Sequence, residues 1–384
     1  MRILLVYHEL GGRGGERLFA TLSKGFISKG HEVYLVVGRI NKDYIPFAPE
    51  VRIIKPPRLL NNLIQNNWVF AFFSMPATFI NIMRTLASAD IIYSGESFTG
   101  LWPAIIASLI SGKKLVLSVF ELGKYVSPPH GWRAVLNFLW DKVNTYLVGK
   151  IKFAVTINST LTPALKNNFG IANVYSIPAG IDFSYFANPN PAKVTKKYGL
   201  GGKKIILMQG LLHPQKRQDL AIKAFSLVKK KIPNSSLIIA GGGDQNYLNK
   251  LKKLAGKLEL EKDIVFTGFV PDDELKNYYS AADLVLMCGP IAGLTIIEAL
   301  LFNKLTIYPT SGKPPLGPVE EYGLGIITKN KSSKEFSRYI VDILLNPSKF
   351  KNKLEKDKKN AISKFSMNSF TNSTFEVLRN AINS

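Results

Sequence analysis

Cysteine and histidine are scarce in this 384-residue sequence, and long apolar runs are absent. The single cysteine, Cys288, excludes an internal disulfide and fits a reducing compartment. The four histidines, His8, His31, His130 and His213, are scattered and lack the spacing of a zinc site. No stretch reaches the ~18 consecutive apolar residues of a membrane-spanning helix. The sequence therefore excludes a disulfide-stabilised scaffold and predicts neither a metal site nor a spanning helix.

Acidic residues are few compared with basic ones, 27 against 50, and the net charge is +23. Such an excess favours polyanionic partners: nucleic acid, anionic lipid surfaces or phosphorylated substrates. The sequence has no helix-turn-helix signature and no aromatic pattern of RNA recognition, so we expect no nucleic-acid partner. A lysine cluster from Lys349 to Lys364 is predicted to be a solvated helix face.

The length suffices for two domains, and an apolar fraction of 46% is typical of a globular protein. The opening MRILLVYHEL is expected to form a strand, not a signal peptide. A glycine-rich loop follows, then an amphipathic helix over 16–28 and a strand over 33–37. This pattern predicts a βαβ unit with a glycine-rich first turn. The alternation continues to a strand at 175–178.

The second half repeats the same alternation of strands and helices. The predicted strands are 205–208, 236–240, 264–266, 284–287 and 305–308, and the predicted helices are 218–229, 246–258, a short one from 272, and 295–301. The stretch 188–204, rich in Pro, Asn, Gly and Lys, is predicted to be the linker. Each half is therefore predicted to be an α/β, Rossmann-like, doubly wound domain. Ligands of such sheets bind at the carboxyl ends of the strands, so two facing domains would bury a ligand in the cleft between them.

The stretch 283–299, DLVLMCGPIAGLTIIEA, is the most informative segment. Its apolar run 284–287 predicts a buried parallel strand, and the glycine-bearing turn that follows leads into the helix at 295. Unpaired N–H groups and the helix dipole make such a junction a phosphate site. Glu298, one turn into the helix, can reach ribose hydroxyls. The alternative is an ordinary strand–helix crossover with a solvated glutamate.

Six landmarks in order resemble those of a family 4 glycosyltransferase of the GT-B fold, a retaining enzyme that uses a nucleotide-activated sugar. They are Gly14–Arg17 (Gly-Gly-Glu-Arg), Gly30–Val33 (Gly-His-Glu-Val), Ile177–Asp182, Gln209–Arg217, the Gly268–Phe269 turn, and the segment ending at Glu298. The resemblance covers nearly the whole chain. It implies an N-terminal acceptor-side domain over 1–185, joined by a C-terminal helix in 365–384 that crosses back, and a donor-side domain over 186–364.

Three positions depart from the family pattern. Pro290 stands where the family usually has the first of two glutamates, a residue that commonly contacts the donor sugar. Leu211 replaces an arginine that usually partners the phosphate-binding lysine, and Phe120 replaces a first-domain histidine. Sugar recognition must therefore differ here or rely on backbone groups, and Lys216 with Arg217 is left to supply positive charge.

The resemblance implies a set of donor-binding residues: Gly14, Gly15, Lys216, Arg217, Phe269, Val270, Gly293, Leu294, Thr295 and Glu298. Lys216 is expected to be catalytic as well, because it can stabilise the leaving diphosphate without a metal or another cofactor. Glu121, the carboxylate nearest to the missing histidine, is expected to orient the acceptor hydroxyl. The plainer alternatives are a surface lysine for Lys216, a helix cap for Thr295 and a simple tight turn for Gly14 and Gly15.

The acceptor is expected to be a lipid-linked or other membrane-proximal glycan. The segment 68–80, WVFAFFSMPATFI, is uncharged, aromatic and interrupted by Pro76, which fits an interfacial segment or a buried core helix. A helix over 132–147 carries aromatics beside Arg133 and Lys142, as suits a headgroup boundary. We therefore expect a cytoplasmic hexosyltransferase that binds the anionic cytoplasmic face of a membrane peripherally.

Other functions remain open on the sequence alone. An epimerase or phosphorylase could share the fold, but we find neither the carboxylate pairs of the former nor the cofactor lysine of the latter. A catalytically inactive protein of the same fold that binds polyanions or nucleotide sugars is motivated by Pro290 and Phe120.

Overall fold

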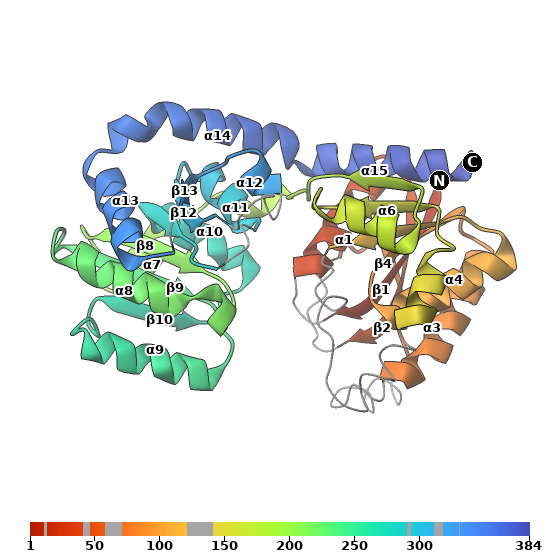
Figure 1. The fold of residues 1–384 in the computed structure, drawn as a ribbon, viewed down its shortest axis with the longest axis horizontal. Coiled ribbons are helices and arrows are strands. Elements are labelled where there is room, and N and C mark those ends of the chain that lie inside the picture. The colour runs from red at the N-terminus through yellow and green to blue at the C-terminus, as the bar shows by residue number, and fades with distance from the viewer. Residues whose placement is uncertain are drawn as a thin grey trace. The chain divides into compact units, whose positions relative to one another are not determined.

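The computed structural model describes residues 1–10, 14–40, 47–57, 71–120, 141–289, 293–310, 318–329 and 331–384. The chain forms two compact units (Figure 1). The first unit comprises Met1–Ile181 with Met367–Ser384, and the second comprises Asp182–Ser366. The sequence analysis had placed these divisions after residues 185 and 364.

The first unit is built on a seven-stranded sheet in which every described strand pair is parallel. Its strands are β1 (Arg2–Leu10), β2 (Glu32–Ile40), β3 (Arg52–Ile54), β4 (Ile91–Gly95), β5 (Leu115–Val119), β6 (Phe153–Thr156) and β7 (Asn173–Ser176), in the order β3-β2-β1-β4-β5-β6-β7. Strands β4, β5 and β6 are buried along their whole length, which explains why they are short apolar runs in the sequence.

Helices cover both faces of this sheet. They are α1 (Gly14–Ile27), α3 (Ala71–Leu86), α4 (Phe98–Ser111), residues 141–148, α6 (Leu161–Phe169) and α15 (Met367–Ile382). Side chains of α3, α4, helix 141–148 and α6 share one core with Leu4, Val6 and Ile92. Alternate strand positions face the other way, where Tyr7 and Tyr93 meet Phe19 of α1.

The last helix, α15, belongs to the first unit, as the predicted return of the C-terminal helix requires. The N–H of Met367 donates to the carbonyl of Ile181 at 3.0 Å, and Thr371 fills the space where Gly25 of α1 has no side chain. The ring of Phe375 stacks on His31, with centroids 4.5 Å apart. Burial lowers the pKa of this histidine, which favours the neutral imidazole at neutral pH.

The second unit contains a six-stranded parallel sheet. Its strands are β8 (Lys204–Gln209), β9 (Ser235–Ala240), β10 (Ile264–Gly268), β11 (Leu284–Leu286), β12 (Thr306–Pro309) and β13 (Ile326–Thr328), in the order β10-β9-β8-β11-β12-β13. Its main helices are α7 (Pro191–Lys197), α8 (Gln218–Lys229), α9 (Gln245–Lys257), α10 (Asp272–Ala281), α11 (Thr295–Leu301), α12 (Pro318–Glu321), α13 (Ser333–Leu345) and α14 (Lys351–Lys364). Two Rossmann-like parallel α/β units thus confirm the predicted fold class.

Two sequence predictions were wrong. Residues 188–204 are not a linker: they lie inside the second unit and include α7, which begins with Pro191, buries Val194 and packs on α10. Pro76 does not end its segment either, because α3 runs through it from Ala71 to Leu86. The remaining part of the predicted aromatic segment, 68–70, and residues 132–140 of the next predicted helix lie outside the described residues.

In the described part of that segment, one side of α3 packs in the core and the other side is exposed to solvent. Ser74, Thr78 and Ile82 are buried, whereas Ile80 is exposed. None of the described helices has the length and apolar content needed to span a bilayer.

Candidate functional site

The candidate site lies at the carboxyl edge of the second unit's sheet. The strand order is β10-β9-β8-β11-β12-β13. Successive strands β8, β9 and β10 are added toward one edge of the sheet, and successive strands β11, β12 and β13 are added toward the other edge. Neighbouring loops therefore diverge between β8 and β11, and crevices at such switch points bind the ligands of doubly wound sheets. The predicted site residues follow these strands.

The loops after β8, β9 and β10 are joined backbone to backbone. The N–H of Leu212 donates to the carbonyl of Gly242 at 2.8 Å, and the N–H of Gly241 donates to the carbonyl of Gly268 at 2.9 Å. A Cβ at Gly241 would strike the carbonyl oxygen of Gly210, so only glycine permits this approach. The backbones of these three loops are therefore closely packed at this edge of the sheet.

Lys216 lies against the loop that follows β11. It ends the short 3₁₀ helix Pro214–Lys216, and a Cβ placed on Gly289 would lie 3.0 Å from the carbonyl oxygen of Gln215 and 3.6 Å from Cδ of Lys216. The side chain is exposed, and within the described ranges its ammonium group has neither an ion-pair nor a hydrogen-bond partner. An exposed cation that pairs with no described residue thus stands at the switch point.

Arg217 differs from its neighbour because its charge is already paired. Its backbone is left-handed, with φ of 57°, and Nε donates to Oδ1 of Asp219 at 3.0 Å. This hydrogen bond raises the pKa of the guanidinium further. A diphosphate would have to compete with Asp219 for the Arg217 guanidinium. Lys216 is therefore better placed than Arg217 to bind a diphosphate.

The start of α11 is tied to the end of β8. Thr295 Oγ1 donates to Oε1 of Gln209 at 3.0 Å, across 86 residues of sequence. Thr295 is the first helical residue, and Leu294 occupies the N-cap position without a side-chain cap bond, so the predicted alternative of a threonine cap does not hold. Gly293 and Leu294 precede the helix directly, while Pro290 lies outside the described residues.

Glu298 is buried rather than solvated. Only 2% of its surface is exposed, and its Oε2 accepts a hydrogen bond from the hydroxyl of Tyr279 at 2.6 Å. The Tyr279 ring is in turn stacked on Phe302, with centroids 5.8 Å apart. The carboxylate is therefore held in one orientation, and Tyr279, which the sequence reasoning missed, is its positioning residue.

Replacing Tyr279 by phenylalanine should lower the free energy of unfolding by about 1.5–3 kcal/mol, because a buried carboxylate would lose a charge-assisted hydrogen bond. Urea denaturation of both proteins measures this difference. The exposed Tyr322 provides the control, since Tyr322→Phe should change stability by less than about 0.5 kcal/mol. Equal stabilities of the Tyr279 and Tyr322 variants would show that this bond contributes nothing.

Two apolar side chains are exposed at the same edge. Phe269 is 75% exposed just after β10, with its Cβ 3.3 Å from the place a Gly242 Cβ would take, and Val270 beside it is buried. Leu211 is also exposed, and its carbonyl accepts from Nε2 of Gln218 at 3.0 Å. The edge thus offers an apolar surface beside the cationic Lys216.

In the first unit, the predicted glycine turn begins α1 at Gly14. A Cβ on Gly15 would strike the hydroxyl of Tyr7 and lie 3.5 Å from the ring of Phe120, so a larger residue there would have to displace the Tyr7 side chain. The N–H of Phe120 donates to Oε2 of Glu96 at 2.7 Å. Glu96, which follows β4, was not singled out in the sequence, and Glu121 lies outside the described residues.

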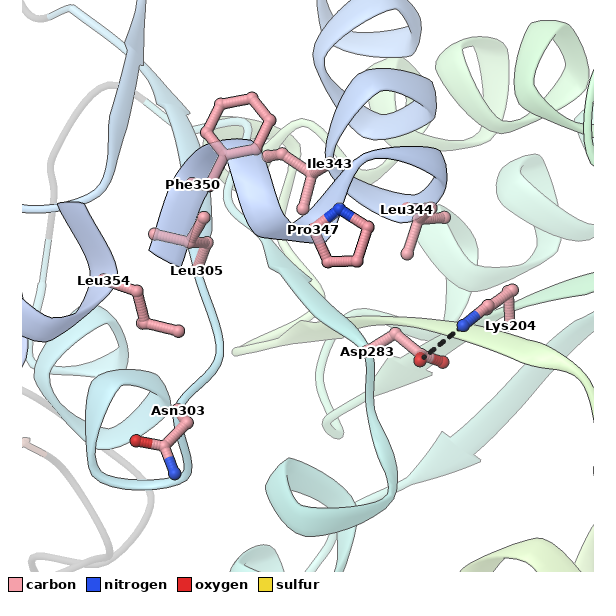
Figure 2. A pocket seen from close by; sticks show the side chains of 9 residues that line it. All are labelled: Lys204, Asp283, Asn303, Leu305, Ile343, Leu344, Pro347, Phe350 and Leu354. Atoms are coloured by element: carbon pink, nitrogen blue, oxygen red, sulfur yellow. Dashed lines mark hydrogen bonds and ion pairs between the residues drawn. The ribbon is translucent and has the colours of Figure 1, made fainter. Parts of the chain in front are cut away.

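Other kinds of site find less support. Among the described residues no group of histidine, cysteine and acidic side chains could hold a metal ion. Burial raises the pKa of the Cys288 thiol, which disfavours the thiolate needed for nucleophilic attack. A cavity of about 110 Å³ lies among Leu305, Phe350 and the Lys204–Asp283 ion pair (Figure 2). It adjoins the amino ends of β8, β11 and β12, the edge opposite to the candidate site.

Most of the second unit is similar to known proteins. Residues 192–363 match the family described as "Glycosyl transferases group 1". The chain is 34% identical over 114 residues to a GDP-mannose-dependent alpha-(1-6)-phosphatidylinositol monomannoside mannosyltransferase of Mycolicibacterium smegmatis, covering 29% of each chain. It is 33% identical over 132 residues to an alpha-monoglucosyldiacylglycerol synthase of Streptococcus pneumoniae, covering 32% of this chain and 30% of the relative. The alignments thus span about a third of these relatives.

A solved structure extends the likeness to the whole fold. Anabaena Alr3699/HepE, crystallised with UDP and glucose, superposes with a TM-score of 0.77 at 19% identity, over 99% of this chain and 100% of that one. At this identity the likeness concerns the fold. The matched region is a glycosyl transferases group 1 domain over residues 192–363, and the likeness in structure shows that the two Rossmann-like units have the GT-B fold.

Proposed function

We propose that this chain transfers a sugar from a nucleoside-diphosphate sugar to an acceptor hydroxyl, with retention of the anomeric configuration. The observation that carries the proposal is the exposed Lys216, which packs against the start of the loop between β11 and α11 and pairs with no described carboxylate. A cation beside a strand–helix loop at a switch point suits a diphosphate.

In this reaction the bond between the anomeric carbon and the diphosphate oxygen breaks, and a bond to the acceptor oxygen forms on the same face. Negative charge develops on the leaving diphosphate. Lys216 and the backbone N–H groups at Gly293–Thr295 would stabilise that charge, a role that needs no metal ion. Glu298, fixed by Tyr279, would accept hydrogen bonds from the ribose hydroxyls, and Phe269 and Val270 would lie near the base.

The acceptor class is proposed from the relatives and from the charge of the chain. The two curated relatives carry phosphatidylinositol monomannoside and diacylglycerol in their names. With a net charge of +23, this chain would be attracted to anionic lipid, so we propose a lipid-linked acceptor at the cytoplasmic face of a membrane. The role of Glu121 in orienting the acceptor hydroxyl stays a prediction.

A thermal-shift screen against UDP-, GDP- and ADP-sugars tests the proposal, because a ligand that binds only the folded state raises its melting temperature. At least one donor should stabilise the wild-type protein, and Lys216→Ala should reduce that shift. If a donor stabilises the protein but is not turned over, the inactive nucleotide-sugar-binding protein is favoured. Pro290 and Phe120, which replace the usual glutamate and histidine, motivate that alternative. No shift with any donor would contradict both.

A further inference from the structure

The first unit concentrates its exposed apolar side chains on one layer of helices. Within the described part of that unit, seven large apolar residues are exposed, and six of them lie on α3, α4 and helix 141–148. These six, which we call the outer face, are Ile80, Ile106, Leu109, Ile110, Val143 and Tyr146. Soluble proteins normally scatter such residues singly, and a concentration of them marks an interaction surface.

The three helices lie side by side. Helix α3 packs along α4, as Figure 1 shows. The indole N–H of Trp102 on α4 donates to Oδ1 of Asn144 at 3.0 Å, which joins α4 to helix 141–148. Their inward sides bury Ile82, Leu101 and Val148 in a single core. The exposed residues therefore project from the same layer, away from the sheet.

Basic residues accompany the outer face. The segments 71–86, 98–114 and 141–150 contain a single carboxylate, Asp141. Their basic residues are Arg84, Lys113, Lys114, Lys142 and Lys150. Of these, Arg84, Lys113, Lys114 and Lys150 make no ion pair with any described residue, and the Lys150 ammonium lies 4.5 Å from the centre of the Tyr146 ring. Apolar side chains beside unpaired cations are the composition that the boundary of an anionic bilayer attracts.

We propose that the outer face rests on an anionic lipid bilayer, with its apolar side chains at the headgroup boundary and its lysines among the lipid phosphates. The proposal rests on the proposed lipid-linked acceptor, and it adds α4 and helix 141–148 to Ile80, the exposed last residue of the segment 68–80. A second copy of the chain is a poorer partner, because a symmetric contact would bring the same lysines against one another.

The test is sedimentation of the full chain with phosphatidylcholine vesicles, with and without phosphatidylglycerol. The wild type should bind only the anionic vesicles, and increasingly weakly as salt rises. The double substitution Lys113→Gln and Lys114→Gln should weaken vesicle binding about 25-fold, because each lysine contributes about fivefold to the affinity. Leu109→Ser with Ile110→Ser should weaken it by about tenfold or more.

Matched substitutions in the second unit serve as controls. Leu345 is 59% exposed and Leu109 is 58% exposed, so Leu345→Ser removes a comparable side chain elsewhere. Lys356→Gln with Lys359→Gln removes two exposed charges from α14. Neither control should change vesicle binding by more than about twofold.

Equal losses in the outer-face variants and in the controls would overturn the proposal, as would equal binding to neutral and anionic vesicles. Self-association of the wild type that Leu109→Ser abolishes, with no vesicle binding, would show a protein contact instead. Donor binding measured without lipid is a separate readout: it should be unchanged in every variant, so a wild type that binds donor but no vesicle would overturn this inference alone.

Discussion

Replacing Lys216 by alanine should slow sugar transfer by about 10²-fold or more, the usual effect of losing one positioned electrostatic group. The ammonium group is exposed beside Gly289 and pairs with no carboxylate among the described residues, so it is available to a diphosphate. Arg217 cannot readily substitute, because Asp219 already holds its guanidinium at 3.0 Å. The initial rate of nucleoside-diphosphate release, at saturating and limiting donor, measures the loss.

The matched control is Lys223→Ala, which removes an exposed lysine from the body of α8, the helix that follows Lys216. That variant should keep wild-type kinetics. Folding is a minor concern, because Lys216 is exposed and contributes little to packing. Unchanged kinetics in Lys216→Ala would show that this lysine does not act on the diphosphate. The proposed site at the switch point would then lack its main cation.

Glu298→Gln should raise the dissociation constant of the donor by about 10- to 100-fold, since charge-assisted hydrogen bonds to ribose hydroxyls are worth about 1.5–3 kcal/mol each. The amide keeps an oxygen that can accept the Tyr279 hydroxyl, so the buried network and the fold should survive. Calorimetric titration with donor gives the affinity, and thermal unfolding without ligand checks stability.

A donor with a 2′,3′-dideoxyribose tests the same contact from the ligand side. It should bind the wild type more weakly than the normal donor, and it should bind wild type and Glu298→Gln about equally. If the wild type binds the dideoxy donor as tightly as the normal one, Glu298 does not contact the ribose, and its bond to Tyr279 is purely structural.

The strands and helices of the second unit were largely predictable. Helices α8 and α11 occupy the predicted residues, and β8 and β11 lie within one residue of the predicted strands. Strands buried on both faces appear as short apolar runs, and glycines mark the turns after them, so local patterns suffice for these elements. Helix α7 was missed because only Val194 in it is apolar and buried, although Pro191 at its start was a usable signal.

The contacts that define the candidate site could not be predicted in the same way. Gln209 and Thr295 meet across 86 residues and Tyr279 and Glu298 across 19, and no spacing rule links such pairs. Helix α3 runs through Pro76 because its side facing the sheet buries Ile82 and Leu86, and this packing outweighs the local cost of proline. Tertiary packing, which a single sequence does not display, decides both cases.

The most direct test of the central claim is the release of nucleoside diphosphate from a panel of nucleotide sugars, assayed with the wild type and with Lys216→Ala. The account predicts measurable release from at least one donor, even without acceptor, and a reduction of about 10²-fold in the variant. The absence of release from every donor, with or without lipid vesicles, would contradict it. Release at the same rate in both proteins would contradict the assignment of the site.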